Sequence, residues 1–403
     1  MDTNLAELLR RRLPPDLLEL VFKAAAAAEA RGDRLFLAGG IVRDLLLGCT
    51  GYDIDLAVEG DAMRLARALA EEENALITLY PAFGTAKILW GRYSLDFAST
   101  RQESYSRPGA LPAVRPGSLT EDLQRRDFTI NAMAVSLNQT DFGVLIDTCG
   151  GRRDMDSKLV RVLHEMSFQD DPTRIWRALR YGQRLNFTIE PQTLGWLERD
   201  IAGLDTISGE RLRYELECVF SEQFPENILA RADELGVLAR LHPGLRADNW
   251  LAEKYTMARQ NDATDTPRDA LYLCLLFYQM EDTDAAALAE ELKLARAAAS
   301  VLHDMRILKN RLDGLSRPGR KPSEVHATLA GLAPAALRAA AIAGANPTAS
   351  RNIEFYLDKL RYVKPGVSGR DILKMGVPPG PLVGDMLRQR LAERLDAEFT
   401  PLS

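Results

Sequence analysis

Two aspartates separated by one residue lie in an otherwise apolar stretch near the N-terminus. Residues 52–58 alternate as a β-strand does, so Asp53 and Asp55 are expected to point to the same face. Adjacent carboxylates repel each other unless a cation lies between them, and hard oxygen ligands of this kind suit Mg²⁺. Asp96, in a second alternating stretch, offers a third carboxylate for a site with two metal ions. The alternative is a solvent-exposed strand face that simply contains two charges.

A glycine turn comes just before these aspartates. Residues 35–47 predict a strand, a turn at Gly39-Gly40 and a helix. Glycines let backbone N–H groups approach an anion, the start of a helix favours negative charge, and Arg43 adds further donors. Such a turn is usually only a turn, but its place beside the carboxylates favours a phosphate site.

Another polar group lies at the start of a predicted helix, in the sequence DDPTRIWRALR of residues 170–180. Asp171 can accept hydrogen bonds and Arg174 can donate them, so the two side chains could bind a group that presents a donor beside an acceptor. Arg174, Arg177 and Arg180 recur every three residues and so lie along one side of the helix. The alternative is that Asp171 only caps the helix and that the arginines are solvated.

The secondary structure that positions these residues changes in kind along the chain. The first third alternates strand-like and helical patterns, which is most simply one mixed sheet. Further strands are predicted at 75–80, 85–90 and 93–99, with a helix at 61–73 and a helix and hairpin before about residue 147. After about residue 160 the pattern is helical, with breaks near 203–209, 242–244, 316–322 and 345–348. The predicted fold class is α+β.

Residues 101–118 contain three prolines and two glycines, which interrupt every periodicity. A segment of this length without regular structure is more typical of a functional mobile loop than of a simple connector. It lies between the Asp96 strand and the next polar motif, at residues 125–132. We therefore expect it to influence the site.

The composition limits the class of protein. With 403 residues, 46% hydrophobic and 27% charged, the chain should form two to four folded domains. The net charge of −6 argues against a general nucleic-acid binder, so any RNA contact needs a local patch. One basic patch lies at residues 306–321, where a solvated charged face is equally plausible. The apolar run at 271–278 is too short for a membrane span and the N-terminus too polar for a signal, which predicts a cytoplasmic protein without a membrane partner.

Cysteine and histidine are sparse. The four cysteines are widely spread without a CxxC pair, so buried, reduced thiols are expected. The four histidines are too dispersed for a metal centre. His303-Asp304 is an HD dipeptide, but a phosphohydrolase site needs several more histidine ligands, so His303 is interpreted as an ordinary helix residue.

Taken in order, these motifs resemble those of the class II tRNA nucleotidyltransferases and bacterial poly(A) polymerases, a branch of the DNA polymerase β superfamily. The matching motifs are GGIVRD at 39–44, DID at 53–55, RRDFTINA at 125–132, DDPTRIWRALR at 170–180, ISGER at 207–211 and GRDIL near the C-terminus, at 369–373. The resemblance implies a mixed-sheet nucleotidyltransferase head (1–158), then an all-helical neck that recognises the nucleobase (159–220), body (221–330) and tail that binds tRNA (331–403).

The resemblance also implies roles for individual residues. Asp53 and Asp55 are expected to bind the metal ions, with Asp96 as a further catalytic acid. The expected nucleotide contacts are Gly40, Arg43, Arg126, Asp127 at the ribose, Asp171, Arg174, Arg177 and Arg180. One departure concerns the neck motif, where the family usually has Glu-Asp and this chain has Asp170-Asp171. The second acid, which the family uses for base recognition, is retained.

The function implied is template-independent addition or completion of the 3′-terminal CCA of tRNA, from CTP and ATP with Mg²⁺. The enzyme is expected to contact the acceptor stem and elbow of the tRNA, and the sequence leaves its oligomeric state open. An enzyme that adds only the terminal A remains an alternative from the same family. The resemblance disfavours a CC-adding enzyme, because CC-adding members have a shortened loop before the RRD motif and residues 101–119 look full length. It also disfavours a poly(A) polymerase, which would call for a basic segment after the DxD strand region, where this chain has FGTAKI at 83–88. A non-enzymatic RNA-binding protein is disfavoured by the intact aspartates.

Overall fold

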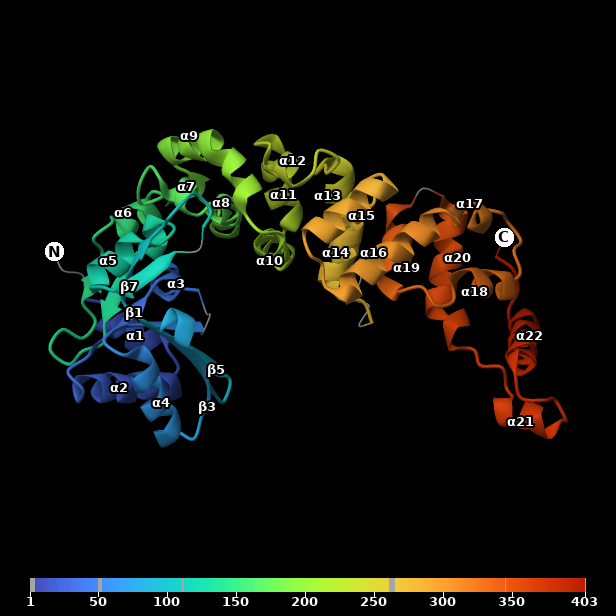
Figure 1. Ribbon diagram of the computed structural model, residues 1–403, viewed down its shortest axis with the longest axis horizontal. Helices are drawn as coiled ribbons and strands as arrows, with labels where there is room; N and C mark the ends of the chain where they lie inside the picture. Colours follow the sequence, from blue (N-terminus) through green and yellow to red (C-terminus); the bar gives the residue numbers. More distant parts are fainter. Residues whose placement is uncertain (1–3, 50–52, 111, 261–264, 345, 403) are drawn as a thin grey trace. The chain divides into compact units, whose positions relative to one another are not determined.

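The computed structural model describes residues 4–49, 53–110, 112–260, 265–344 and 346–402 (Figure 1). Tyr52, at the start of a predicted strand, and Ala345, in a predicted break, lie outside these ranges. The chain divides into two compact units, Met1–Ile207 and Ser208–Ser403. The first unit contains every sheet strand and the second is helical, so the predicted α+β class is confirmed.

A seven-stranded mixed sheet forms the centre of the first unit, in the order β3-β4-β5-β2-β1-β8-β9. Its strands are β1 (Arg34–Ala38), β2 (Asp53–Glu59), β3 (Leu76–Tyr80), β4 (Thr85–Trp90), β5 (Tyr93–Ser99), β8 (Ala134–Ser136) and β9 (Leu145–Ile146). β2 and β5 pair in parallel, whereas the other neighbours pair antiparallel. The strands predicted at 75–80, 85–90 and 93–99 are confirmed.

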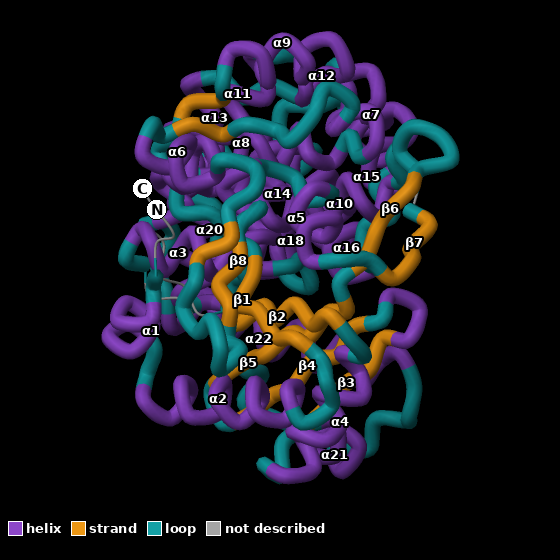
Figure 2. The backbone as a smooth tube through the Cα atoms, turned by 90° about the vertical axis from the view of Figure 1, so that its left-hand side faces the viewer, coloured by secondary structure: helices purple, strands orange, loops and turns teal. Residues whose placement is uncertain are grey.

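The two faces of this sheet are covered differently. Helices α2 (Pro15–Glu29) and α4 (Ala62–Glu72) pack against each other and against the strands, on the face where Ile54 and Leu56 are buried (Figure 2). The opposite face is covered only in part, by α5 (Leu119–Gln124), whose Leu119 and Leu123 pack on Phe36 of β1. The carboxylates of β2 lie on this second face because side chains alternate along a strand.

The turn between β1 and α3 (Gly40–Leu47) requires glycine at its first position. Gly39 has φ +86°, a left-handed conformation that other residues adopt only with strain. A Cβ atom built there would lie 2.3 Å from the guanidinium of Arg126. The absent side chain therefore lets Arg126 lie directly against the turn.

Two short strands, β6 (Arg101–Ser104) and β7 (Ala113–Pro116), pair antiparallel, and we call these strands and the described residues between them the arm. The expectation of a segment without regular structure was therefore wrong. The prolines bracket the pairing: Pro108 and Pro112 lie in the connection, and Pro116 is the last residue of β7. Proline is tolerated at such positions because no central ladder hydrogen bond is lost.

The remaining elements are mostly helical. In the first unit they are α1 (Ala6–Arg12), η1 (Pro81–Phe83), η2 (Thr129–Asn131), α6 (Gly151–Asp156), β10 (Leu159–Val160), α7 (Ser167–Asp170), α8 (Thr173–Leu185), β11 (Thr188–Ile189), α9 (Pro191–Asp200) and η3 (Ile201–Thr206). In the second unit they are α10 (Gly209–Phe220), α11 (Pro225–Glu234), α12 (Val237–Leu241), α13 (Asn249–Arg259), α14 (Arg268–Phe277), α15 (Asp282–Glu291), α16 (Arg296–Lys309), α17 (Leu312–Leu315), α18 (Pro322–Leu329), α19 (Pro334–Ala343), α20 (Pro347–Asp358), η4 (Leu360–Tyr362), α21 (Gly369–Lys374) and α22 (Pro381–Glu398).

The last helices of the second unit share one apolar core, which includes Leu308, Leu329, Ile353 and Leu395. Within the described part of the chain, no single helix is long and apolar enough to cross a membrane. α18 and α19 pass that test only as a pair bent by 114°, and both contribute buried residues to this core.

The four cysteines are unpaired, as expected, but only Cys274 is buried. Cys149 and Cys218 are half-buried, and Cys49 is exposed because it follows the turn that ends α3. The expectation that all four thiols are buried was therefore wrong.

Candidate active site

The acidic group of the sheet lies on its partly open face. Asp53 and Asp55 are solvent-exposed, and the register places Asp55 beside Asp96 of β5 and Asp53 beside Ser94. Lys87 of β4 is the next residue across, and its Nζ lies 2.9 Å from Oδ2 of Asp96. Asp96 is therefore a direct neighbour of the pair but already has a cationic partner.

The environment of Asp55 disfavours its charge. Solvent reaches this carboxyl through a cavity, but protein surrounds it on the other sides, and this partial burial raises its pKa. Arg126 opposes the change, whereas the neighbouring carboxylates of Asp96 and Asp53 add to it, and the pKa reaches about 6. A cation at this position would relieve the repulsion between the carboxylates.

The donor set fits a hard divalent cation, because Asp53 and Asp55 present carboxylate oxygens from one strand face. In the described ranges, no three His, Cys, Asp or Glu side chains lie close enough together to form a metal site. The three aspartates are thus not preassembled around one point, and Asp96 is paired with Lys87.

A cavity of about 400 Å³ adjoins Asp55 and brings together residues from distant parts of the first unit. Its lining consists of Gly40, Asp55, Glu103, Tyr105, Pro112, Arg125, Arg126, Asp127, Asn131, Asp171, Arg174, Arg177 and Tyr181. Seven of the residues expected from the sequence are among these. Asp53, Asp96, Arg43 and Arg180 are not part of the lining.

Asp127 is almost fully buried at the wall of this cavity. It accepts hydrogen bonds from Arg177 at 2.6 and 2.9 Å and from the side-chain amide of Asn131 at 3.0 Å. Burial alone would raise the pKa of Asp127, but the charge of Arg177 and these hydrogen bonds lower it to about 2. Asp127 is therefore a stable carboxylate at neutral pH.

The expected base-reading residues lie at the start of α8. Oδ1 of Asp171 accepts from the backbone N–H and the hydroxyl of Thr173, at 3.1 and 2.7 Å. The N-cap is Pro172 and the helix begins at Thr173, so Asp171 precedes the cap by one residue but still accepts hydrogen bonds from the first helical residue. The residue also lines the cavity, so the two interpretations are compatible.

Arg174 is almost fully buried and is positioned by backbone carbonyl groups. Its Nη2 donates to the carbonyl oxygen of Arg125 at 2.8 Å, and its Nη1 donates to that of Ser167 at 3.4 Å. Arg126 is fixed by Asp122 at 3.1 Å. Both guanidinium groups are therefore oriented before any ligand binds.

Tyr181 is a residue that the sequence reasoning missed. The guanidinium carbons of Arg43, Arg177, Arg180 and Arg184 lie between 5.1 and 5.7 Å from the centre of its ring. Cation–π attraction of this kind partly offsets the repulsion between like charges. Tyr181 follows Arg177 by four residues on α8, and this helical spacing was the only signal in the sequence.

Arg43, expected to contact the nucleotide, is not among the residues that line the cavity. Its guanidinium is buried and donates to Asp44 at 2.8 and 2.9 Å and to Asn131 at 2.5 Å. Its guanidinium carbon lies 5.1 Å from the centre of the ring of Tyr181, which does line the cavity.

The arm also contributes residues that had not been singled out. The hydroxyl of Tyr105 donates to Oε2 of Glu103 at 2.8 Å, and Arg125 donates to Oε1 of the same carboxylate at 2.9 Å. Burial and the charge of Glu103 raise the pKa of Tyr105. The backbone N–H of Gly109 donates to the carbonyl of Gln169 at 3.2 Å, so the arm reaches from the sheet to the segment before α8.

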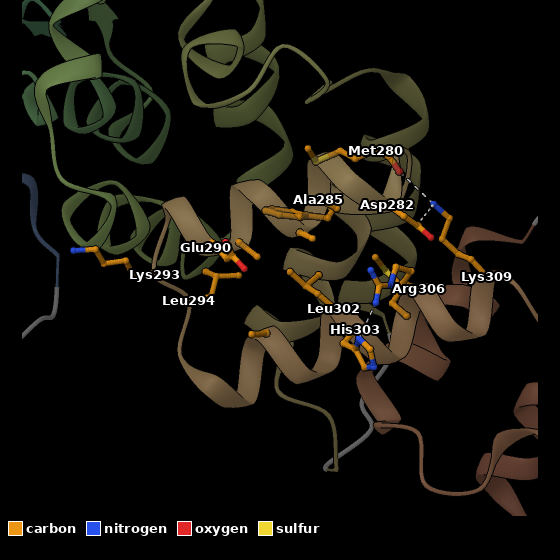
Figure 3. A pocket seen from close by; sticks show the side chains of 15 residues that line it. Met280, Asp282, Ala285, Glu290, Lys293, Leu294, Leu302, His303, Arg306 and Lys309 are labelled. Carbon is orange, nitrogen blue, oxygen red and sulfur yellow. Dashed lines mark hydrogen bonds and ion pairs between the residues drawn. The ribbon is translucent and has the colours of Figure 1, made fainter.

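A separate cavity of about 280 Å³ lies in the second unit, among α14, α15 and α16 (Figure 3). Apolar residues such as Ala285 and Leu302 line it, and at its edge Lys309 pairs with Asp282 at 3.7 Å. Nδ1 of His303 lies 3.2 Å from Nη2 of Arg306. None of the residues expected to do chemistry lines this cavity, so the cavity beside Asp55 is the candidate active site.

The HD dipeptide and the basic patch have structural partners. Asp304 accepts from the backbone N–H of Ala333 at the start of α19. In the patch at 306–321, Lys309 donates to the carbonyls of Tyr278 and Met280, and Arg311 donates to that of Thr328. Lys309 and Arg311 therefore contact backbone carbonyl groups of neighbouring helical segments, and these contacts are compatible with both interpretations of the patch, an RNA contact and a solvated charged face.

Comparison with known proteins agrees with this arrangement. Residues 35–161 match the poly A polymerase head domain, and residues 186–248 match a domain described as the probable RNA and SrmB-binding site of polymerase A. The A-adding tRNA nucleotidyltransferase of Halalkalibacterium halodurans is 31% identical, with 97% of this chain and 92% of that protein aligned. Together the fold and the aligned motifs define a nucleotidyltransferase of the DNA polymerase β type.

A second relative is the A-adding enzyme of Geobacter sulfurreducens, which is 33% identical over 98% of this chain. The chain spans 47% of the length of that relative. The solved structure of the Thermotoga maritima CCA-adding enzyme complexed with tRNA matches 98% of this chain and 95% of its own, with a TM-score of 0.76 and 28% identity. This chain belongs to the class II tRNA nucleotidyltransferase family.

Proposed function

We propose that the chain adds or completes the 3′-terminal CCA of tRNA, using CTP and ATP without a nucleic-acid template. The main support is the cavity that joins Asp55, the Arg126-Asp127 motif and the Asp171/Arg174 pair. The first and the last of these residues are more than 100 positions apart in the sequence. Each group has a chemistry suited to a different part of a nucleoside triphosphate.

Asp53 and Asp55 are the residues that would bind Mg²⁺. When bound, the ions would lower the pKa of the RNA 3′-hydroxyl and stabilise the departing pyrophosphate during in-line displacement at the α-phosphorus. Asp96 would keep its pair with Lys87 and contribute negative charge beside them.

The triphosphate would lie beside the glycine turn. Gly40 exposes the start of α3 to the cavity, and Arg126 lies directly against that turn. Arg177 and Arg180 would add charge from α8, with Tyr181 keeping the guanidinium groups together. Arg43 would act through this cluster as a positioning residue.

The base and the ribose would occupy the other end. Asp171 would accept from the exocyclic amine of cytosine or adenine while Arg174 donates to the adjacent ring nitrogen. Guanine and uracil present a carbonyl and an N–H there and would leave charged groups unpaired, which is costly. Asp127 would face the ribose, and the arm would close the cavity with Tyr105.

The helical part of the chain is proposed to bind the tRNA acceptor stem and elbow, through backbone and 2′-hydroxyl contacts that recognise shape. The match of residues 186–248 to an RNA-binding domain supports this, as does the likeness to an enzyme solved with tRNA. In this proposal the neck, body and tail keep the boundaries 159–220, 221–330 and 331–403.

Addition of the terminal A alone is the second candidate. The named relatives from Geobacter and Halalkalibacterium are both A-adding enzymes, whereas the matched Thermotoga structure is a CCA-adding enzyme. The site itself, with one carboxylate and one guanidinium for the base, is compatible with either.

The deciding experiment uses tRNA transcripts that end at the discriminator base, at C or at CC, with CTP and ATP supplied separately and together. Extension of all three to CCA supports the full activity. Extension of only the CC transcript, by one A, supports the A-adding activity, and extension of none contradicts the proposed function.

A further inference from the structure

The sheet face that contains Asp53 and Asp55 has an exposed apolar edge. Leu76 of β3 is 74% exposed and Leu89 of β4 is 47% exposed, and the two are direct partners across the strands. On the opposite face the same strands pack against α4. Exposed leucines beside an acidic site point to a binding surface, because scattered single leucines are common but paired ones on a functional face are not.

Two rows of side chains connect this edge with the aspartates. In one, Leu76 neighbours Leu89, which neighbours Ser94, and Ser94 neighbours Asp53. In the other, Thr78, Lys87, Asp96 and Asp55 follow one another in the same way. Since adjacent strands are about 4.8 Å apart, three steps give a surface roughly 14 Å wide.

The in-line geometry of the proposed reaction indicates which ligand binds to this surface. In an in-line displacement the attacking oxygen and the leaving pyrophosphate lie on opposite sides of the phosphorus. The cavity proposed for the triphosphate joins Asp55 to Gly40 at the start of α3, and α3 contacts β1 and β2, on the other side of β2 from β5. With the triphosphate beside α3, the RNA 3′-hydroxyl would approach from the β5 side, over the two rows.

We propose that the exposed face of β5, β4 and β3 is the docking surface for the last nucleotides of the RNA 3′ end. Leu76 and Leu89 pack against base and ribose, and Lys87 is the cation that faces the phosphate next to the terminal nucleotide. This inference rests on the proposed function, since it takes the side of approach from the reaction.

The test uses the double variant Leu76→Ser/Leu89→Ser. Both side chains are exposed, so the fold should be retained. We expect the KM for tRNA ending in CC to rise roughly tenfold, because each leucine loses part of its buried area, while the KM for ATP and the maximal rate stay unchanged. Leu47→Ser, an exposed leucine at the end of α3, is the matched control and should leave both KM values within about twofold.

A second measurement does not depend on turnover. A tRNA with 5-iodocytidine as its 3′-terminal residue is irradiated in complex with the wild-type protein, and the crosslinked peptide is identified. We expect it to lie within residues 76–96. Crosslinks confined to other segments, or a double variant with the wild-type KM for tRNA, would overturn the proposal.

Two further outcomes separate the alternatives. If the double substitution converts a dimer into a monomer and leaves the KM for tRNA unchanged, the face binds a second copy of the chain and the proposal is wrong. If the wild-type protein adds no nucleotide to any tRNA but the crosslink still maps to residues 76–96, the proposed function fails and the docking surface stands.

Discussion

Arg177 donates two hydrogen bonds to Asp127, a residue 50 positions earlier in the chain. The pair joins α8 to the segment after α5, and both residues line the candidate active site. Asn131 donates to the other oxygen of Asp127, so the carboxylate is bound on both sides. This contact fixes the proposed base-reading helix relative to the sheet.

Asp127→Asn should lower the free energy of unfolding at pH 7 by about 2 kcal/mol, because its pKa is about 2 in the folded protein and near 3.8 in the unfolded chain. A lowered pKa stabilises the fold above the unfolded value, and that stabilisation is lost as the pH falls from 3.8 towards 2. Urea denaturation at pH 7 and pH 3 measures the difference. Asp156→Asn, in an exposed ion pair with Arg152, is the control and should change stability by less than about 1 kcal/mol.

Asp53→Ala and Asp55→Ala should each abolish nucleotide addition while tRNA binding is retained, since each removes a proposed metal ligand and no proposed RNA contact. Gel-shift affinity and single-turnover rates, with Mg²⁺ as the only divalent ion, measure the two properties. Glu71→Ala, an exposed acid on α4, is the control. Near-normal turnover in either aspartate variant would contradict the two-metal assignment.

Mg²⁺ should stabilise the wild-type protein at pH 8 and much less at pH 5. The pKa of Asp55 is raised to about 6 without a metal ion, so the carboxyl is largely protonated at pH 5 and competes poorly for the cation. Thermal melts with and without Mg²⁺ at the two pH values test this. In Asp55→Asn the shift of the melting temperature caused by Mg²⁺ should be small at both pH values. A shift as large as in the wild type would contradict the assignment of Asp55 as a metal ligand.

Asp171→Ala should relax base selection more than it weakens the fold. The loss of its contacts with Thr173 should cost about 0.5 to 2 kcal/mol of stability. Incorporation of GTP and UTP relative to ATP measures selection, and Arg174→Ala should relax it in the same assay. Arg177→Ala should mainly raise the KM for both nucleotides. An Asp171→Ala enzyme that still excludes GTP and UTP as the wild type does would reduce Asp171 to a helix cap.

Deleting residues 107–115 from the arm should suppress addition of A to tRNA ending in CC. Adenine is larger than cytosine, so one base-reading pair can serve both only if its helix shifts, and the arm contacts the segment before that helix through Gly109 and Gln169. Addition of C, if the intact protein performs it, should survive. Single-turnover rates of A addition and C addition, measured in parallel for the intact and the deleted protein, test this prediction. An equal loss of both additions would contradict a specific role of the arm in A addition.

Much of the fold follows from local patterns. Alternation predicted the strands around Asp53 and Asp96, and the turn at Gly39-Gly40 predicted the start of α3, because these signals lie within a few residues. The arm was not predicted, because its two strands have only four residues each and are separated by prolines and a glycine.

The candidate site was predictable only as separate motifs. That Asp55 and Asp96 are neighbours depends on the pairing of β2 with β5, about 40 residues apart, which no local pattern specifies. In the same way the ion pair of Asp96 with Lys87, and the arginines around Tyr181, are consequences of packing. Sequence spacing identified most of the charged residues but not the aromatic residues between them.

The cluster around Tyr181 affects how the helix responds to ligands. Four guanidinium groups within 6 Å of one ring repel each other, and cation–π attraction offsets this only in part. A bound polyanion would neutralise these charges and remove the repulsion. The arginines and α8 would then move less than they do without the ligand. The helix proposed to select the base would then become stiffest when a triphosphate is bound, and discrimination between bases would be sharper for nucleoside triphosphates than for free nucleosides.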